Sequence, residues 1–202
     1  MKKIFLTSSL KGTKKLLKKF LEDIESDEVL FIPTASKVEE YTQYVSDARC
    51  TFKELDVKID EFNLSDSDRE TALKKLSNSK IIYFTGGNSF YLLQELNRLD
   101  LVNFIHEEVQ KGKIYIGESA GAIIASNNIE YSQEMDDKEK AENLVNYAGL
   151  SLVDFYVVPH FKEFPFIEST EAVLEKYSEK LRLIPINNKE AIIVNGSEVE
   201  KK

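Results

Sequence analysis

One serine stands between two glycines where a buried strand is expected to end. The stretch YIGESAGAII, residues 115–124, contains the pattern G-x-S-x-G with Ser119 at its centre. Residues 113–117 are apolar enough for a buried strand, and a helix is expected to begin at Ala120. A sharp strand-to-helix turn exposes its central side chain, and flanking glycines avoid collisions inside the bend. Ser119 is therefore a candidate nucleophile, although the pattern also fits a glycine-rich turn whose serine only caps the helix.

A serine hydroxyl is a poor nucleophile without a base, and the chain has two histidines, His106 and His160. His160 lies in the stretch FYVVPHF, just after an expected strand over residues 153–158 that Pro159 ends. It is therefore expected to share the carboxyl edge of the sheet with the serine. His106 falls on an expected helix, and we interpret it as a packing or surface residue. His160 is the predicted base.

A carboxylate commonly orients such a histidine, and in hydrolases with this type of turn the chain order is serine, acid, histidine. The segment IEYSQEMDD lies between the two residues in this chain. Its four carboxylates are Glu130, Glu134, Asp136 and Asp137. Most of these are expected to be solvated loop residues, and spacing alone leaves all four open.

Backbone amides near the serine are expected to stabilise an oxyanion. The amide of Ala120 lies at the start of the expected helix, where N–H groups are free and the helix dipole is positive. A second turn, Gly86-Gly87-Asn88, follows an expected strand over residues 80–84. Gly87 is the candidate second donor, because glycine allows the backbone to approach a ligand closely. The alternative is an ordinary turn in which Asn88 caps the next helix.

Short apolar runs alternate with helical patterns along the chain. The expected strands cover residues 3–7, 28–33, 55–62, 80–84, 113–117 and 153–158. The expected helices cover residues 11–25, 37–50, 66–78, 89–98 and 166–180, with one more capped by Asp100 and a terminal β pair over 182–199. This alternation predicts an α/β fold: a doubly wound, mostly parallel, flavodoxin-like sheet with helices on both faces. Ligands bind at the carboxyl ends of such strands, which singles out the turns at 33–36, 85–89 and 117–121.

Composition narrows the class of protein further. The 202 residues are interpreted as a single α/β domain over residues 1–202, and the net charge of −8 argues against sequence-independent nucleic-acid binding. A single cysteine, no secretory pattern and no apolar run long enough for a membrane span indicate a cytoplasmic protein. Two histidines and one cysteine are a poor set for zinc, and the glycine-rich turns match neither nucleotide-binding pattern.

Four motifs in order, FIPTAS, YFTGGNSFYLL, GESAGA and VVPHF, resemble the peptidase E family of serine dipeptidases over nearly the whole chain. Cyanophycin-degrading enzymes are more distant members of that group. The resemblance implies a fold similar to that of class I glutamine amidotransferases, with serine in place of cysteine at the turn. It also implies cytoplasmic cleavage of dipeptides that carry an N-terminal aspartate, without a metal or organic cofactor.

The resemblance also assigns roles to residues. The family's nucleophile falls on Ser119 and its histidine on His160. Its oxyanion segment falls on Gly86 to Asn88, with Gly87 and Ala120 as amide donors and with Gly86 and Asn88 beside the substrate. The family's acid stands in an Asn-Asp-Met context, whereas this chain has Gln133-Glu134-Met135. Glu134 is therefore the expected third catalytic residue, and it departs from the family pattern.

Three other functions remain open at this point. One is a different serine acyl hydrolase, either cyanophycinase-like or an esterase or amidase for a small acidic substrate. Another is a binding or regulatory homologue that has lost the chemistry, for which the Glu134 departure is the main support. A third is an interaction protein that uses its acidic surface. The expected partner is a small peptide substrate, with no nucleic acid and no membrane, and the oligomeric state stays open.

Overall fold

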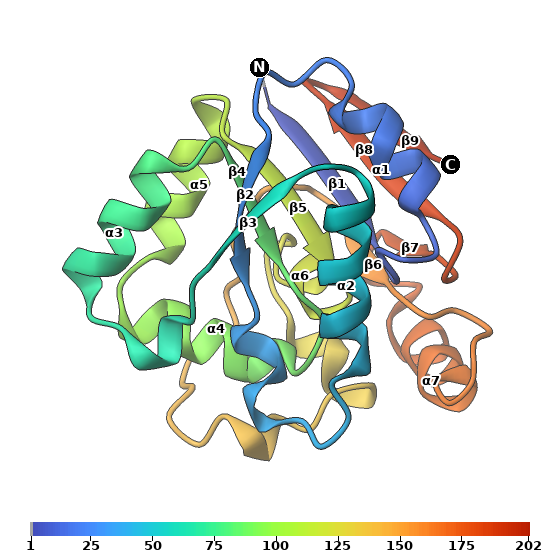
Figure 1. Cartoon of the computed structure of the whole chain (residues 1–202). Helices are drawn as coiled ribbons and strands as arrows, with labels where there is room; N and C mark the ends of the chain where they lie inside the picture. Colours follow the sequence, from blue (N-terminus) through green and yellow to red (C-terminus); the bar gives the residue numbers. More distant parts are fainter. Residues whose placement is uncertain (1) are drawn as a thin grey trace.

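The structure is a computed structural model that describes residues 2–202, and within them a seven-stranded sheet forms the centre of the protein (Figure 1). The strand order is β3-β2-β4-β5-β1-β8-β9. Five neighbouring strands are parallel: β1 (Lys3–Thr7), β2 (Glu28–Ile32), β3 (Lys58–Glu61), β4 (Ile81–Phe84) and β5 (Ile114–Glu118). Strand β8 (Ala191–Asn195) pairs antiparallel with β1, and β9 (Glu198–Lys201) pairs antiparallel with β8. The predicted α/β fold with a mostly parallel sheet is confirmed.

Helices cover both faces of this sheet, because apolar residues on each central strand point alternately to one side and the other. Phe5 of β1 packs with α1 (Lys14–Leu21) and α2 (Gln43–Glu54), which lie together on one face (Figure 1). Its neighbours Ile4 and Leu6 belong to the larger core on the other face. That core contains the remaining helices: α3 (Arg69–Asn78), α4 (Ser89–Arg98), α5 (Val102–Gln110), α6 (Ala120–Ile123) and α7 (Ile167–Tyr177). Of the helices in residues 2–202, none is long and apolar enough to cross a membrane.

Two elements differ from the sequence expectation. Strand β6 (Tyr156–Val158) does not join the central sheet, and it pairs in parallel with β7 (Leu183–Pro185) in a separate two-stranded sheet. The expected cap of α5 is also wrong. Asp100 has a φ of 51° in the turn between α4 and α5, and Leu101 occupies the N-cap position. The described part of the chain also contains four short 3₁₀ segments: Thr34–Val38, Leu64–Asp66, Glu130–Glu134 and Lys138–Lys140.

The three turns singled out in the sequence meet at the carboxyl edge of the parallel strands. A Cβ placed on Gly87 would lie 2.3 Å from the backbone carbonyl of Ala35, so these two turns are in close contact. The N–H of Asn88 donates to the carbonyl oxygen of Ala35 at 2.9 Å. A Cβ placed on Gly86 would lie 3.3 Å from Cβ of Ser119, which brings in the third turn. The fold therefore gathers the glycine-rich turns around one serine.

Candidate active site

Ser119 lies in a sharp turn between β5 and α6. Its backbone has φ 48° and ψ −105°, a strained conformation for a residue with a side chain, and its N–H donates to the carbonyl oxygen of Thr7 at 2.8 Å. A Cβ on Gly117 would lie 2.4 Å from the carbonyl oxygen of Gly121, and one on Gly121 would lie 2.4 Å from that of Phe84. Both positions therefore require glycine. The serine side chain makes no capping hydrogen bond to α6, so the helix-cap alternative does not describe this turn.

His160 contacts the serine directly. Its Nε2 lies 2.9 Å from Ser119 Oγ. His160 follows β6 with a φ of 59°, and its backbone N–H donates to Ser8 Oγ at 2.9 Å. The ring of Phe166 stacks on the imidazole, with centroids 4.6 Å apart and planes 20° from parallel. The backbone, Ser8 and Phe166 together hold the imidazole in one orientation.

An asparagine orients the other side of the imidazole. Nδ1 of His160 lies 2.7 Å from Asn188 Oδ1, in the turn between β7 and β8. Since the asparagine oxygen can only accept, Nδ1 carries the proton and Nε2 is free to accept the serine hydroxyl. Burial lowers the pKa of His160, while the Asn188 hydrogen bond and the charge of Glu163 act in the opposite direction. Burial therefore favours the neutral imidazole, which is the form that a general base requires.

The expectation that Glu134 lies behind His160 is wrong. Its carboxylate pairs with Lys176 of α7, with Oε1 and Nζ 2.6 Å apart. The 3₁₀ segment that carries Glu134 packs against α7, whereas Nδ1 of the histidine faces the turn between β7 and β8. The carboxylate of Glu134 is therefore not the hydrogen-bond partner of His160 Nδ1.

The other three candidate acids also have different roles. Asp136 accepts hydrogen bonds from the N–H and the Oγ of Ser89, at 2.9 and 2.6 Å, and burial raises its pKa to about 6. Asp137 accepts from the N–H of Glu139 at 3.0 Å, and Glu130 is exposed. Asp136 and Asp137 thus hold the loop through hydrogen bonds, and Glu130 faces solvent. None of the three is hydrogen-bonded to the imidazole of His160.

Asn188 has no recognisable sequence motif, and close backbone packing holds it in place. A Cβ on Gly12 would lie 1.8 Å from the carbonyl oxygen of Asn188, so this approach of two loops requires glycine. The N–H of Asn188 donates to Glu163 Oε1 at 3.3 Å. Glu163 follows the histidine by three residues, and its charge is the one that acts on the pKa of His160. The four acids expected from the sequence lie between the serine and the histidine in the chain, whereas Asn188 comes after both.

Two free amides lie beside the serine. Gly87 has a φ of 129°, which favours glycine, and a Cβ there would collide with Ala35. Within residues 2–202, the N–H groups of Gly87 and Ala120 donate to no protein acceptor. Free N–H groups next to a nucleophile are the donors that an oxyanion requires. Across the same residues, histidine, cysteine, aspartate and glutamate side chains form no group of three that could hold a metal ion.

Asn88 and His106 have structural contacts instead. Asn88 is buried, its Oδ1 accepts from the N–H of Tyr91 at 2.9 Å, and its Nδ2 donates to the carbonyl oxygen of Asp137 at 2.8 Å. It therefore caps α4, as the alternative held, and both ends of its side-chain amide are engaged in these contacts. His106 Nδ1 lies 2.9 Å from the carbonyl oxygen of Leu150, which agrees with a packing role.

Glu118, directly before Ser119, is a buried carboxyl to which no sequence motif points. Its Oε1 accepts from the N–H of Leu10 at 2.7 Å, and its Oε2 accepts from the hydroxyl of Tyr83. Burial raises the pKa of Glu118 to about 7. The side chain thus joins β5, β4 and the loop after β1 beneath the nucleophile.

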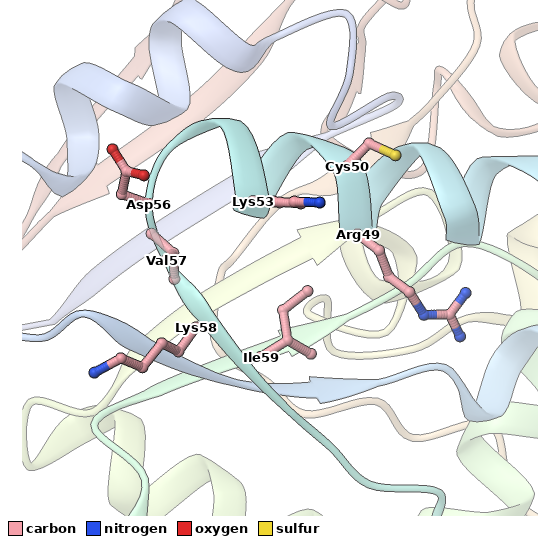
Figure 2. A pocket seen from close by; sticks show the side chains of 7 residues that line it. All are labelled: Arg49, Cys50, Lys53, Asp56, Val57, Lys58 and Ile59. Atoms are coloured by element: carbon pink, nitrogen blue, oxygen red, sulfur yellow. The ribbon is translucent and has the colours of Figure 1, made fainter.

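A separate surface hollow of about 490 Å³ is lined by other residues (Figure 2). It opens where α2 ends and β3 begins, at the amino end of the sheet. Its lining residues are Arg49, Cys50, Lys53, Asp56, Val57, Lys58 and Ile59. None of the catalytic candidates borders it, so the site is the serine edge.

Ser119 has a strained backbone, is hydrogen-bonded to the imidazole of His160 and lies at the carboxyl edge of a parallel sheet. This arrangement places the chain in the class of α/β proteins suited to acyl transfer. Residues 4–202 match the sequence profile of Peptidase family S51, and the chain belongs to this family. The chain is therefore a peptidase of the α/β class, and the resemblance to peptidase E is confirmed.

Individual relatives agree with this assignment. The chain is 46% identical to an uncharacterized peptidase of Pasteurella multocida, over 97% of this chain and 95% of that protein. It is 29% identical to a peptidase E of a Nostoc species, over 76% of this chain and 57% of that protein. A solved structure of a peptidase E-like protein from Listeria monocytogenes superimposes with a TM-score of 0.95 at 44% identity, covering 100% of this chain and 98% of that one.

Proposed function

We propose that this protein is a cytoplasmic serine dipeptidase that cleaves small peptides with an N-terminal aspartate. The observation that carries the serine mechanism is the 2.9 Å contact between Ser119 Oγ and His160 Nε2 in a strained turn. The preference for aspartate is supported by the motif resemblance and by relatives named peptidase E. The coarser assignment to Peptidase family S51 does not by itself specify the substrate.

The reaction proceeds through an acyl-enzyme. His160 Nε2 takes the hydroxyl proton as Ser119 Oγ attacks the scissile carbonyl carbon. The N–H groups of Gly87 and Ala120 hold the developing oxyanion. The protonated imidazole then gives its proton to the leaving amine, and a water molecule activated by the same imidazole hydrolyses the ester.

The third residue of this mechanism is Asn188, a neutral amide. Its oxygen fixes the tautomer of His160, which is the part of the orienting role that geometry requires. Because Asn188 is neutral, it brings no negative charge next to the imidazolium that forms during the reaction. The charge of Glu163 supplies part of the electrostatic stabilisation of that imidazolium. The proposal for an inactive homologue rests on the unusual Glu134, and Glu134 pairs with Lys176 away from the imidazole.

Hydrolysis of a dipeptide panel tests the proposal. Asp-X dipeptides and matched dipeptides with other N-terminal residues are compared between wild type and Ser119→Ala, together with labelling by a fluorophosphonate probe. The expected result is cleavage of Asp-X by wild type, labelling at Ser119, and loss of both in the variant. Equal turnover by the two proteins would exclude the serine mechanism. Faster cleavage of esters or other amides would instead favour the alternative acyl hydrolase.

A further inference from the structure

The hydroxyl of Tyr44 is unusual within the described chain. Among residues 2–202, Tyr44 Oη is the one buried side-chain oxygen or nitrogen that has no hydrogen-bond partner. Buried phenol hydroxyls ordinarily have a partner, because an unsatisfied group loses its bond to water without replacement. A hydroxyl of this kind beside Ser119 has an oxygen that is available to accept a hydrogen bond.

Tyr44, in the first turn of α2, lies beside the proposed nucleophile. A Cβ placed on Gly86 would be 3.4 and 3.5 Å from ring atoms Cδ2 and Cε2 of Tyr44, and 3.3 Å from Cβ of Ser119. The phenol ring and the serine therefore flank the same side of the Gly86 backbone. When a substrate carbonyl carbon meets the serine oxygen, the α-nitrogen of that residue is only two bonds away. The α-nitrogen of a bound substrate is therefore expected on the side of the Gly86 turn where Tyr44 lies.

The electrostatic surroundings of Tyr44 favour a cation. Burial first, and then the negative charges of Glu39, Glu118 and Asp136, raise the pKa of Tyr44, so the hydroxyl stays protonated and neutral. These carboxyl groups have other partners, namely Lys140, Tyr83 and Ser89 in turn. They shape the potential at Tyr44 without bonding to its hydroxyl. Because this position is shielded from bulk water, a charge-assisted hydrogen bond formed there is strong.

We propose that Tyr44 determines specificity for a free N-terminus, with its hydroxyl oxygen accepting a hydrogen bond from the α-ammonium group of the substrate residue that acylates Ser119. This inference rests on the proposed peptidase function and adds the group that the site recognises. The same negative surroundings disfavour a second carboxylate, so the aspartate side chain of the substrate points away from Tyr44.

The variant Tyr44→Phe separates this role from a structural one. The fluorogenic arylamide of aspartate is compared with its N-acetylated form, which lacks the ammonium group. We expect kcat/KM for the free amine to fall by about 10–100-fold in the variant and that for the acetylated substrate to stay unchanged. The melting temperature is expected to stay level or rise, because an unsatisfied hydroxyl is removed. No change for either substrate, or an equal fall for both, would overturn the proposal.

Tyr41→Phe is the matched control. This tyrosine lies one turn earlier, its side chain is 71% exposed, and the substitution removes the same atom. It is expected to leave both substrates and the melting temperature unchanged. A fall in Tyr41→Phe equal to that in Tyr44→Phe would point to the whole turn and not to the buried hydroxyl, and it would count against the proposal.

Binding without turnover distinguishes this inference from the proposed function. Ser119→Ala and Ser119→Ala with Tyr44→Phe are titrated calorimetrically with Asp-Leu and with N-acetyl-Asp-Leu. We expect the first protein to bind the free dipeptide at least tenfold more tightly than the acetylated one, and the second to lose that preference. Equal binding of both ligands by the first protein, or no binding of either, overturns the inference. A clear preference in binding without hydrolysis by wild type would retain it and reject the proposed peptidase reaction.

Discussion

The turn that carries Ser119 and the turn that carries Asn188 reach the same site by different routes. In the first, five consecutive residues carry the turn: Gly117 admits a close contact with Gly121 inside it, and Gly121 admits one with Phe84 of the neighbouring strand. In the second, a histidine and an asparagine 28 residues apart meet across two loops, and Gly12 from a third loop permits it. The glycine pattern that marks the Ser119 turn is thus contained in a short stretch of sequence, whereas the partner of the histidine depends on the packing of distant segments.

The two sides of the site also differ in charge. Next to Ser119 lies the buried carboxyl of Glu118, whose pKa is raised to about 7 by burial. Behind the histidine lies the neutral amide of Asn188, with the carboxylate of Glu163 one contact further away. The imidazole is therefore oriented mainly by hydrogen bonding, and the negative charge that acts on it comes from outside the direct contact.

The largest expected effect comes from removing either half of the central contact. Ser119→Ala and His160→Ala are each expected to lower kcat/KM for an Asp-X substrate by roughly 10⁴–10⁶-fold. Since the two residues act as one unit, the double variant is expected to be no worse than the more damaging single variant. Single-turnover and steady-state rates measure this. A double variant whose loss equals the product of the single losses would contradict a shared mechanism.

The next prediction compares Asn188, the observed partner of the histidine, with Glu134, the expected one. Asn188→Ala removes the acceptor for Nδ1–H, and we expect kcat to fall by about 10²–10³-fold as the tautomer and ring orientation are lost. Glu134→Gln is the matched control, because it breaks only the contact with Lys176, and its kcat is expected to stay within about twofold of wild type. A larger loss in Glu134→Gln than in Asn188→Ala would reverse the assignment.

A third prediction concerns stability beneath the nucleophile. The pKa of Glu118 is raised from an ordinary value of 4.5 to about 7, so the unfolded chain releases this proton at lower pH than the folded protein does. The contribution of the protonated group is present below pH 4.5 and is lost as pH rises toward 7. We expect the unfolding free energy of Glu118→Gln, relative to wild type, to rise by about 2–3 kcal/mol over this range. Urea unfolding at pH 4.5 and pH 7 measures it, and a pH-independent difference would show that the pKa of Glu118 is not raised in the folded protein.

The smallest expected effect sharpens the charge comparison. Asn188→Asp keeps the acceptor and adds a negative charge beside the imidazole, which raises the pKa of His160. Because the base must be neutral, activity is lost as pH falls through that pKa, so the acid limb of the pH–rate profile is expected to move to higher pH by about 1–2 units. Asn187→Asp, one residue earlier, is the control and is expected to leave the limb in place. An unchanged limb in Asn188→Asp would mean that residue 188 does not act on the imidazole.

The prediction of the fold from the sequence was accurate where the pattern is local. Five apolar runs correspond to β1 to β5, and the expected α4 begins and ends at the predicted residues. The expectation that the strand before His160 belongs to the central sheet is wrong. A short apolar run has the same sequence pattern whether it pairs with the central sheet or with β7. The expectation that Asp100 caps α5 is wrong as well. Asp100 has a φ of 51° because it lies in the tight turn between α4 and α5.

The sequence by itself determined the turn at Ser119, the glycines around it and the neighbouring Gly87, because steric limits on φ and ψ act between residues close in the chain. It also indicated His160 as the base, although β6 lies outside the central sheet and only the tertiary structure brings this histidine to Ser119. Only the tertiary structure decided that Asn188 and not Glu134 meets the imidazole, and that Tyr44 is left without a partner. The physical reason is that hydrogen-bond partners are chosen by distances of about 3 Å, and such distances between remote loops depend on the packing of the whole chain.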